Sequence, residues 1–290
     1  MLPLICAVAC GLCNIAVGWS MKGAQNAECR TVWFGGFGNG IALLLSLSFL
    51  PFFTGPWAVG GVWLIGIMLG GLFCAAIMLN VLANVMGPPS VAWSMANMGL
   101  LVPVVLAWFM GEMLCRTDLM MLAAFLLMLA AFQRGMTTAK DSIKTRPWLY
   151  GLLLAAVFLV NGLLMFCFKL NQLLFPAANK ASLLVAMYGS GFFLFSLMVL
   201  RSRHSRRSRI AVSGSEMKWG VMLGAAISIT QILMQSAMSL PAIIVFPLVQ
   251  GLALIGGVGL MAYVYRETLN YFKIIGIIFG LIVIVLSVTR

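Results

Sequence analysis

Charge is the scarcest property of this sequence. Asp, Glu, Lys and Arg together make up 8% of the 290 residues, whereas 63% of the residues are hydrophobic. A soluble domain carries about 25% charged residues, so this composition excludes a water-exposed surface over most of the chain. The sequence therefore predicts an all-α integral membrane protein.

Acidic residues and histidine are missing from the interior of the apolar runs. The acids stand at the ends of these runs or between them: Glu28, Glu112, Asp118, Asp141, Glu216 and Glu267. The single histidine, His204, lies in the basic stretch RSRHSRRSR. No carboxylate pair, Ser/His/Asp set or metal-ligand cluster stands at membrane depth. The sequence therefore predicts no enzyme, no cofactor and no metal site.

The seven cysteines are scattered along the chain. Two residues separate Cys10 from Cys13, but no histidine or second cysteine pair is present to complete a metal site. Free thiols that pack as small hydrophobic side chains are expected.

Ten apolar segments are candidates for membrane spans, each of which needs about 20 apolar residues. They cover residues 2–21, 32–53, 58–84, 89–111, 118–133, 148–169, 181–200, 218–238, 241–264 and 269–289. The N-terminus lacks the basic region of a signal peptide, so the first span is expected to be retained. Gly87-Pro88-Pro89 and Leu240-Pro241 separate two pairs of spans. Since proline suits the first turn of a helix, these gaps predict tight helical hairpins.

Lys and Arg are divided unevenly between the two predicted sides. Of the 18 basic residues, 14 fall in the gaps after spans one, five, seven and nine. The other four are Arg116, Lys169, Lys180 and Arg290. Positive charge accumulates on the cytoplasmic side, so both termini are predicted to lie outside the cytoplasm. The net charge of +12 is thus attributed to basic residues between the spans that set the orientation of the chain and contact anionic lipid headgroups. No nucleic-acid partner is expected.

The two halves of the chain repeat a series of uncommon residues. At shifts of 147 to 155 the matches are Asn14/Asn161, Lys22/Lys169, Gln25/Gln172, Asn80/Gln231, Asn84/Gln235, Pro89/Pro241, Gly99/Gly251 and Glu112/Glu267. Five spans per copy is an odd number, so the second copy must cross the membrane in the opposite sense. The sequence therefore predicts two inverted five-helix repeats, residues 1–135 and 148–290, joined by a basic loop at 136–147. This is a recurrent plan of secondary transporters.

Two segments in equivalent places carry a family resemblance. PPSVAWSMANMGLLVPVVLAWFMGE and PAIIVFPLVQGLALIGGVGLMAYVYRE, within ten spans in two halves, resemble the drug/metabolite transporter (DMT) superfamily. The EamA-like ten-helix branch is most similar, with sugar porters of the glucose/ribose type as near relatives. The resemblance implies that the fourth and ninth spans line a central cavity. Many such proteins keep both termini in the cytoplasm, whereas the charge distribution here predicts the reverse.

Polar side chains inside the spans are the candidates for substrate contact, because such groups usually face the bundle interior or a cavity. The predicted substrate-binding residues are Asn14, Trp93, Asn97, Asn161, Tyr188, Gln231 and Gln250. Trp93 and Asn97 are four residues apart and so share one helix face. The alternative is that these groups join helices through hydrogen bonds worth about 0.6–2 kcal/mol. Lys22 and Lys169 are predicted gate or vestibule residues, or cations that complement a helix dipole.

The leading hypothesis is a secondary transporter of small polar metabolites, such as amino acids, sugars or nucleosides, that works by alternating access. The alternative is an exporter of drugs or amphipathic waste, although no buried acid is present to exchange protons for cations. Further alternatives are a membrane enzyme or lipid-handling protein and a scaffold. The expected setting is a bacterial cytoplasmic membrane, with the chain as a monomer or homodimer among membrane lipids.

Overall fold

A computed structural model of the chain describes residues 1–57, 59–87, 89–111, 115–136, 146–204, 212–264 and 270–288. Every regular element in these residues is helical. The helices are α1 Leu2–Asn26, α2 Thr31–Phe49, η1 Leu50–Phe52, α3 Gly60–Met86, α4 Pro89–Met98, α5 Leu101–Phe109, α6 Arg116–Met136, α7 Pro147–Leu174, α8 Lys180–His204, α9 Gly214–Ala237, α10 Ala242–Val264 and α11 Tyr271–Val288.

Eight of the described helices are long and apolar enough to cross a membrane. Two shorter apolar helical stretches, Met95–Phe109 and Tyr271–Ser287, add to them. Many large apolar side chains on these helices face outward, as expected of surfaces that contact lipid. The prediction of an all-helical, multi-pass membrane protein agrees with this architecture.

The predicted fourth span, residues 89–111, is not one continuous helix. It is divided into α4 and α5 by a turn at Gly99 and Leu100. Pro103 has no N–H to donate to the Gly99 carbonyl, which instead accepts from Val102 N at 3.0 Å. A Cβ on Gly99 would lie 2.9 Å from the Phe158 carbonyl oxygen of α7, so glycine permits this close approach. At Gly251, the matching position in the predicted repeat, an added Cβ would have its nearest neighbour 3.8 Å away, and α10 continues unbroken.

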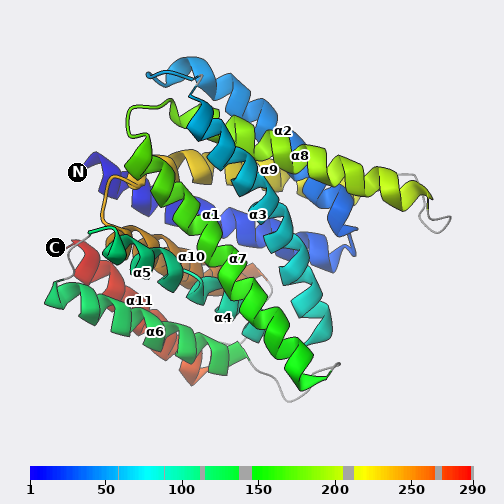
Figure 1. The fold of residues 1–290 in the computed structure, drawn as a ribbon. Coiled ribbons are helices and arrows are strands. Elements are labelled where there is room, and N and C mark those ends of the chain that lie inside the picture. Colours follow the sequence, from blue (N-terminus) through cyan, green and yellow to red (C-terminus); the bar gives the residue numbers. More distant parts are fainter. Residues whose placement is uncertain are drawn as a thin grey trace.

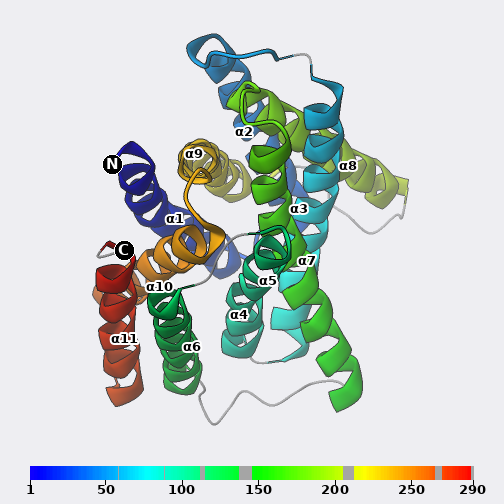
Figure 2. The ribbon, with the colours of Figure 1, turned by 60° about the vertical axis from the view of Figure 1, so that its left-hand side comes forward.

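The helices pack in pairs that join the two halves of the chain (Figures 1 and 2). Helix α1 packs against α9 and α10, and α7 packs against α3, α4 and α5. Helix α2 contacts both α8 and α9, and α3 contacts α8. Helices α6 and α11 form a further pair at the edge of the bundle. Both termini lie on the same side of the bundle, as Figures 1 and 2 show.

Glycine brings two of these helix pairs into close contact. A Cβ on Gly224 of α9 would lie 2.5 Å from the Gly38 carbonyl oxygen of α2. A Cβ on Gly70 of α3 would lie 2.4 Å from the Met187 carbonyl oxygen of α8. Membrane helices pack closely through small residues because lipid gives little hydrophobic drive for their association. Small residues therefore bring the backbones of α2 and α9, and of α3 and α8, close together.

Candidate functional site

Helix α9 carries the densest set of buried polar side chains in the spans. The Tyr188 hydroxyl of α8 donates to the Ile227 carbonyl at 3.3 Å, and the Ser228 hydroxyl donates to the Ala42 carbonyl of α2 at 3.3 Å. Tyr188 is fully buried, and its ring meets Phe73 of α3 edge-on at 6.4 Å. These contacts place the predicted residue Tyr188 one helical turn from Gln231, another predicted residue.

Several polar atoms on this part of α9 are buried without a hydrogen-bond partner. Gln235 is fully buried, and neither its amide oxygen nor its amide nitrogen has a partner. Gln231 Oε1 and Thr230 Oγ1 are also unpartnered. A buried polar group without a partner costs about 1–3 kcal/mol, so these atoms are the candidates for contact with a polar ligand or with water.

Helix α2 brings another unpartnered hydroxyl to the same level. Ala42 of α2 faces Ser228 of α9, and the two helices run in the same direction at this contact. One turn further along, this register places Ser46 level with Gln231 and Ile232. Ser46 is fully buried, and its hydroxyl has no partner. The combined groups are neutral donors and acceptors, which suit an uncharged polar part of a ligand.

Asn14 and Gln250 lie on the neighbouring α1 and α10. The Cys10 thiol of α1 contacts the Thr230 carbonyl of α9 at 3.3 Å, which positions α1 against the polar stretch. A Cβ on Gly11 would lie 3.0 Å from the Val249 carbonyl of α10. Asn14, three residues after Gly11, and Gln250, next to Val249, are both half-buried. Helix α1, which carries Asn14, thus packs against both α9 and α10, the helices that carry Gln231 and Gln250.

Asn97 and Asn161 form a second group at the break between α4 and α5. Asn97 is 5% exposed near the end of α4, and Asn161 precedes Gly162, which contacts Gly99. The Asn161 amide donates to the Val157 carbonyl one turn earlier at 2.8 Å. The side chain of Trp93, the predicted aromatic partner of Asn97, lies outside the described residues. Glu112, Glu267 and the basic loop at 137–145 also lie outside them.

The predicted gate residue Lys169 is buried and bonded to another helix. It is 3% exposed, and its ammonium group donates to the Leu240 carbonyl at 2.9 Å and the Met238 carbonyl at 3.3 Å. Met238 caps the C-terminus of α9, so the lysine neutralises the negative end of that helix. The prediction that Lys169 ends its own helix is wrong, because α7 continues to Leu174. The turn that follows α9 offers unsatisfied carbonyls within reach of Lys169.

Lys22, its counterpart in the predicted repeat, is half-buried on α1 and makes no comparable hydrogen bond within the described part of the chain. Lys180, at the start of α8, approaches the Ser236 hydroxyl of α9 at 3.5 Å. Two lysines of the second half, Lys169 and Lys180, therefore lie close to the C-terminal end of α9.

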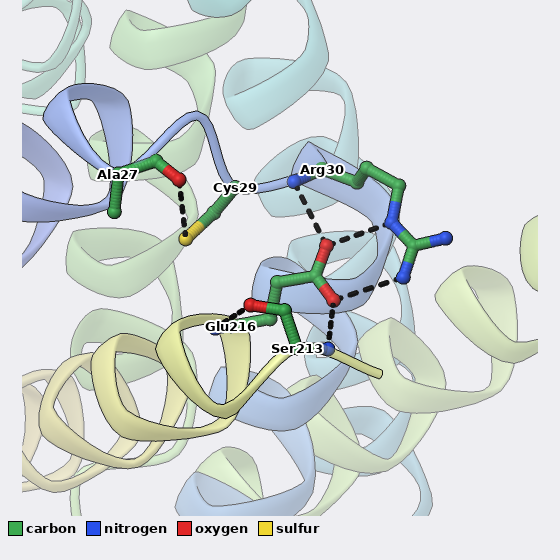
Figure 3. Close-up of polar contacts among 5 residues, drawn as sticks. All are labelled: Ala27, Cys29, Arg30, Ser213 and Glu216. Carbon is green, nitrogen blue, oxygen red and sulfur yellow. Dashed lines mark hydrogen bonds and ion pairs between the residues drawn. The ribbon is translucent and has the colours of Figure 1, made fainter. Parts of the chain in front are cut away.

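An ion pair that the sequence analysis missed joins the α1–α2 corner to α9 (Figure 3). The Arg30 guanidinium donates from Nε to Glu216 Oε1 at 2.7 Å and from Nη2 to Oε2 at 2.9 Å. Glu216 also accepts from the backbone N–H groups of Arg30 at 3.1 Å and Ser213 at 2.9 Å. Ser213 and Glu216 form a capping box. The S-x-x-E spacing of SGSE was a sequence signal for this helix start.

A comparable contact joins the α7–α8 corner to the segment before α3. The Asn179 side-chain amide donates to the carbonyls of Phe53 at 2.6 Å and Leu50 at 3.2 Å. The Asn179 backbone N–H donates to the Pro56 carbonyl at 3.2 Å. Asn179 is 4% exposed and holds together two connections that are far apart in sequence. The position of Asn179 between two predicted spans was not enough to predict these contacts with the segment before α3.

In the described part of the chain, no group of three or more His, Cys, Asp or Glu side chains converges to hold a metal ion. The polar groups that do converge are amides and hydroxyls. They can bind or orient a molecule, and they do not provide an acid, base or nucleophile at the same place.

Comparison with known proteins identifies the fold. No protein-family model matches the sequence, and no curated protein matches it. A protein of known crystal structure matches the fold with a TM-score of 0.72 at 15% sequence identity. The match covers 97% of this chain and 98% of the other. The whole helical arrangement therefore exists in a solved protein, and at this identity the likeness extends to the fold alone.

Proposed function

We propose that the chain is a secondary transporter of small polar organic metabolites, related to the drug/metabolite transporters. In this proposal, ten spans form two inverted five-helix repeats, and the repeats rock around a site between them. The alternative function, export of drugs or amphipathic waste, has no specific observation in its favour.

The main observation in favour of the proposal is that helices of the first half pack against helices of the second half in a reciprocal pattern. If the second repeat begins at α7, then α1 corresponds to α7, α2 to α8, α3 to α9, α4–α5 to α10 and α6 to α11. The α1–α9 contact then has its equivalent in α7–α3, and α1–α10 has its equivalent in α7–α4 and α7–α5. The α2–α9 contact likewise corresponds to α8–α3. Such reciprocity is expected of two copies related by a two-fold axis.

The corner contacts support the same relation. Arg30 follows α1 and binds the start of α9, whereas Asn179 follows α7 and binds the segment before α3. Under the proposed repeat these are equivalent places, although the side chains differ. The position of both termini on one side of the bundle supports an even number of crossings.

The polar groups on α9 support a substrate that carries uncharged hydrogen-bonding groups. Neutral donors and acceptors come from Gln231 and Gln235 of α9 and from Ser46 of the neighbouring α2. The described spans bring no carboxylate beside them. Binding at this point would satisfy atoms that are otherwise unpaired, which adds affinity for molecules with matching groups. Sugars, nucleosides and amino acids have such groups.

Replacing Gln235 by leucine tests the proposal because it separates binding from packing. The change removes two unpartnered buried atoms, so we expect the free energy of unfolding to stay equal or rise by about 1 kcal/mol. If Gln235 contacts substrate, uptake into proteoliposomes should fall at least tenfold. Uptake is measured with a panel of radiolabelled amino acids, sugars and nucleosides, and the recovered solute is analysed for chemical change.

Gln133→Leu is the matched control, because Gln133 is half-buried on α6 at the edge of the bundle. We expect it to leave uptake unchanged. Normal uptake by the Gln235→Leu protein would remove this residue from the site. Absence of flux for every solute, or recovery of a chemically altered solute, would contradict the transporter function itself.

A further inference from the structure

A groove of about 590 Å³ runs along the outside of the bundle between α2 and α8. Gly36 and Gly40 form its floor, and Trp33, Phe192 and Leu200 are among the apolar side chains that form its walls. The hydroxyl of Ser196, which also lines it, donates to the Phe192 carbonyl at 2.8 Å and needs no further partner. The surface is therefore suited to a hydrocarbon chain and offers it no polar obstacle.

The length of the groove matches one leaflet of a bilayer. Along α2 it extends from Val32 to Leu44, which corresponds to about 18 Å of helix. Half of a typical hydrocarbon core measures about 15 Å. An acyl chain that enters at one membrane surface would thus occupy the groove down to the middle of the bilayer.

Among the described residues that line or adjoin the groove, the basic ones stand at one end. Arg201 directly follows the lining residue Leu200 and is exposed at the C-terminal end of α8. On the other wall, the Arg30 guanidinium lies 5.4 Å from the centre of the Trp33 ring, which lines the groove. This end belongs to the side that the distribution of Lys and Arg assigns to the cytoplasm, where anionic lipids are concentrated.

From these features we infer that the α2–α8 groove binds one anionic phospholipid of the cytoplasmic leaflet. An acyl chain lies over Gly36 and Gly40, and the phosphate lies at the surface beside Arg201. The chain length, the apolar lining and the charge at one end together select a phospholipid over a second protein chain, which would need no charge at the membrane surface. The site is independent of the proposed transport function.

Native mass spectrometry of the detergent-purified full chain tests this site, with dioleoyl phosphatidylglycerol and dioleoyl phosphatidylcholine as probes. The wild-type protein should retain one phosphatidylglycerol with at least threefold higher affinity than phosphatidylcholine. Gly36→Leu should weaken both at least tenfold. A Cβ at position 36 has its nearest neighbour at 3.7 Å, so the added side chain projects into the groove without displacing α8. Arg201→Gln should abolish the preference for phosphatidylglycerol.

Two controls match these changes in chemistry. Gly71→Leu adds the same side chain to α3 where no atom lies within 4 Å, and Lys218→Gln removes one exposed charge at the start of α9. Both should bind lipid as the wild type does. Leu44→Trp, at a position that is 63% exposed, fills the inner end of the groove without changing a glycine and should also weaken binding.

Unchanged lipid binding in Gly36→Leu and Leu44→Trp would overturn the inference. So would a wild-type dimer that these two changes dissociate while lipid binding persists, because a second copy of the chain would then occupy the groove.

Discussion

Replacement of Lys169 by methionine is expected to lower the free energy of unfolding by about 2–4 kcal/mol and to slow uptake at least tenfold. The change removes two hydrogen bonds from a buried ammonium group to the Met238 and Leu240 carbonyls. Bonds that involve a charged group contribute about 1.5–3 kcal/mol each, and the desolvation cost of the buried ammonium group, which methionine does not bear, offsets part of their loss. Their loss frees α7 from the turn between α9 and α10. Thermal unfolding in detergent and proteoliposome uptake measure the two effects.

Thiol labelling provides a structural measurement of the same change. Cys167 is 7% exposed and lies two residues before Lys169, so opening of this contact should speed its reaction with a maleimide at least tenfold. Mass spectrometry of peptides distinguishes Cys167 from the other cysteines. Lys22→Met is the matched control, and we expect its effect on stability to stay within about 0.5 kcal/mol. Equal stability and equal labelling in the Lys169→Met and Lys22→Met proteins would show that the contact is unimportant.

The second large effect is expected from Glu216→Ala. This carboxylate accepts four hydrogen bonds, from the Arg30 side chain and from the backbone N–H groups of Arg30 and Ser213. Its removal leaves these donors without a partner and removes the Glu216 half of the capping box, whereas the Ser213 hydroxyl still accepts from the backbone N–H of residue 216. We expect a loss of about 2–3 kcal/mol, below the range for a fully buried ion pair because the Arg30 side chain is 34% exposed.

A double-mutant cycle with Arg30→Ala identifies the ion pair as the cause. The double variant should be little less stable than Glu216→Ala alone, because the second change removes a partner that is already lost. Glu28→Gln, an exposed acid in the same corner, should leave the melting temperature unchanged. Additive losses in the cycle would mean that Arg30 and Glu216 act separately.

The positions of the helices could be predicted from the sequence because they depend on local composition. Runs of about 20 apolar residues and prolines at short gaps located most spans to within a few residues. The break at Gly99 was not predicted: Pro103 is a local signal for it, but the close approach of α7 at Gly99 is a contact between distant segments that no local pattern reports. Gly251 is followed at the same spacing by Ile255 where Gly99 is followed by Pro103, and α10 continues unbroken there.

The candidate site was predicted only in part, for a related reason. Because polar residues are rare in apolar runs, Gln231, Tyr188 and Asn97 could be identified as candidates. Rarity alone could not distinguish a side chain that contacts a ligand from one that hydrogen-bonds to a neighbouring helix. The structure shows Tyr188 bonded to a backbone carbonyl and Gln235 with no bond. Lys169 was predicted as the last residue of the span 148–169, whereas it binds the Met238 and Leu240 carbonyls in the turn that follows α9. Such partners are fixed by tertiary packing.

The pairing of α1 with α9 has a consequence for how the chain is made. The Cys10 thiol and its partner at Thr230 are 220 residues apart. At about 5–20 residues per second, a ribosome takes about 10–40 s to synthesise the intervening segment. During that time the first helix has left the ribosome but has no partner for its buried face. Nascent chains must therefore be sheltered by lipid, by the insertion machinery or by a chaperone until the second half emerges.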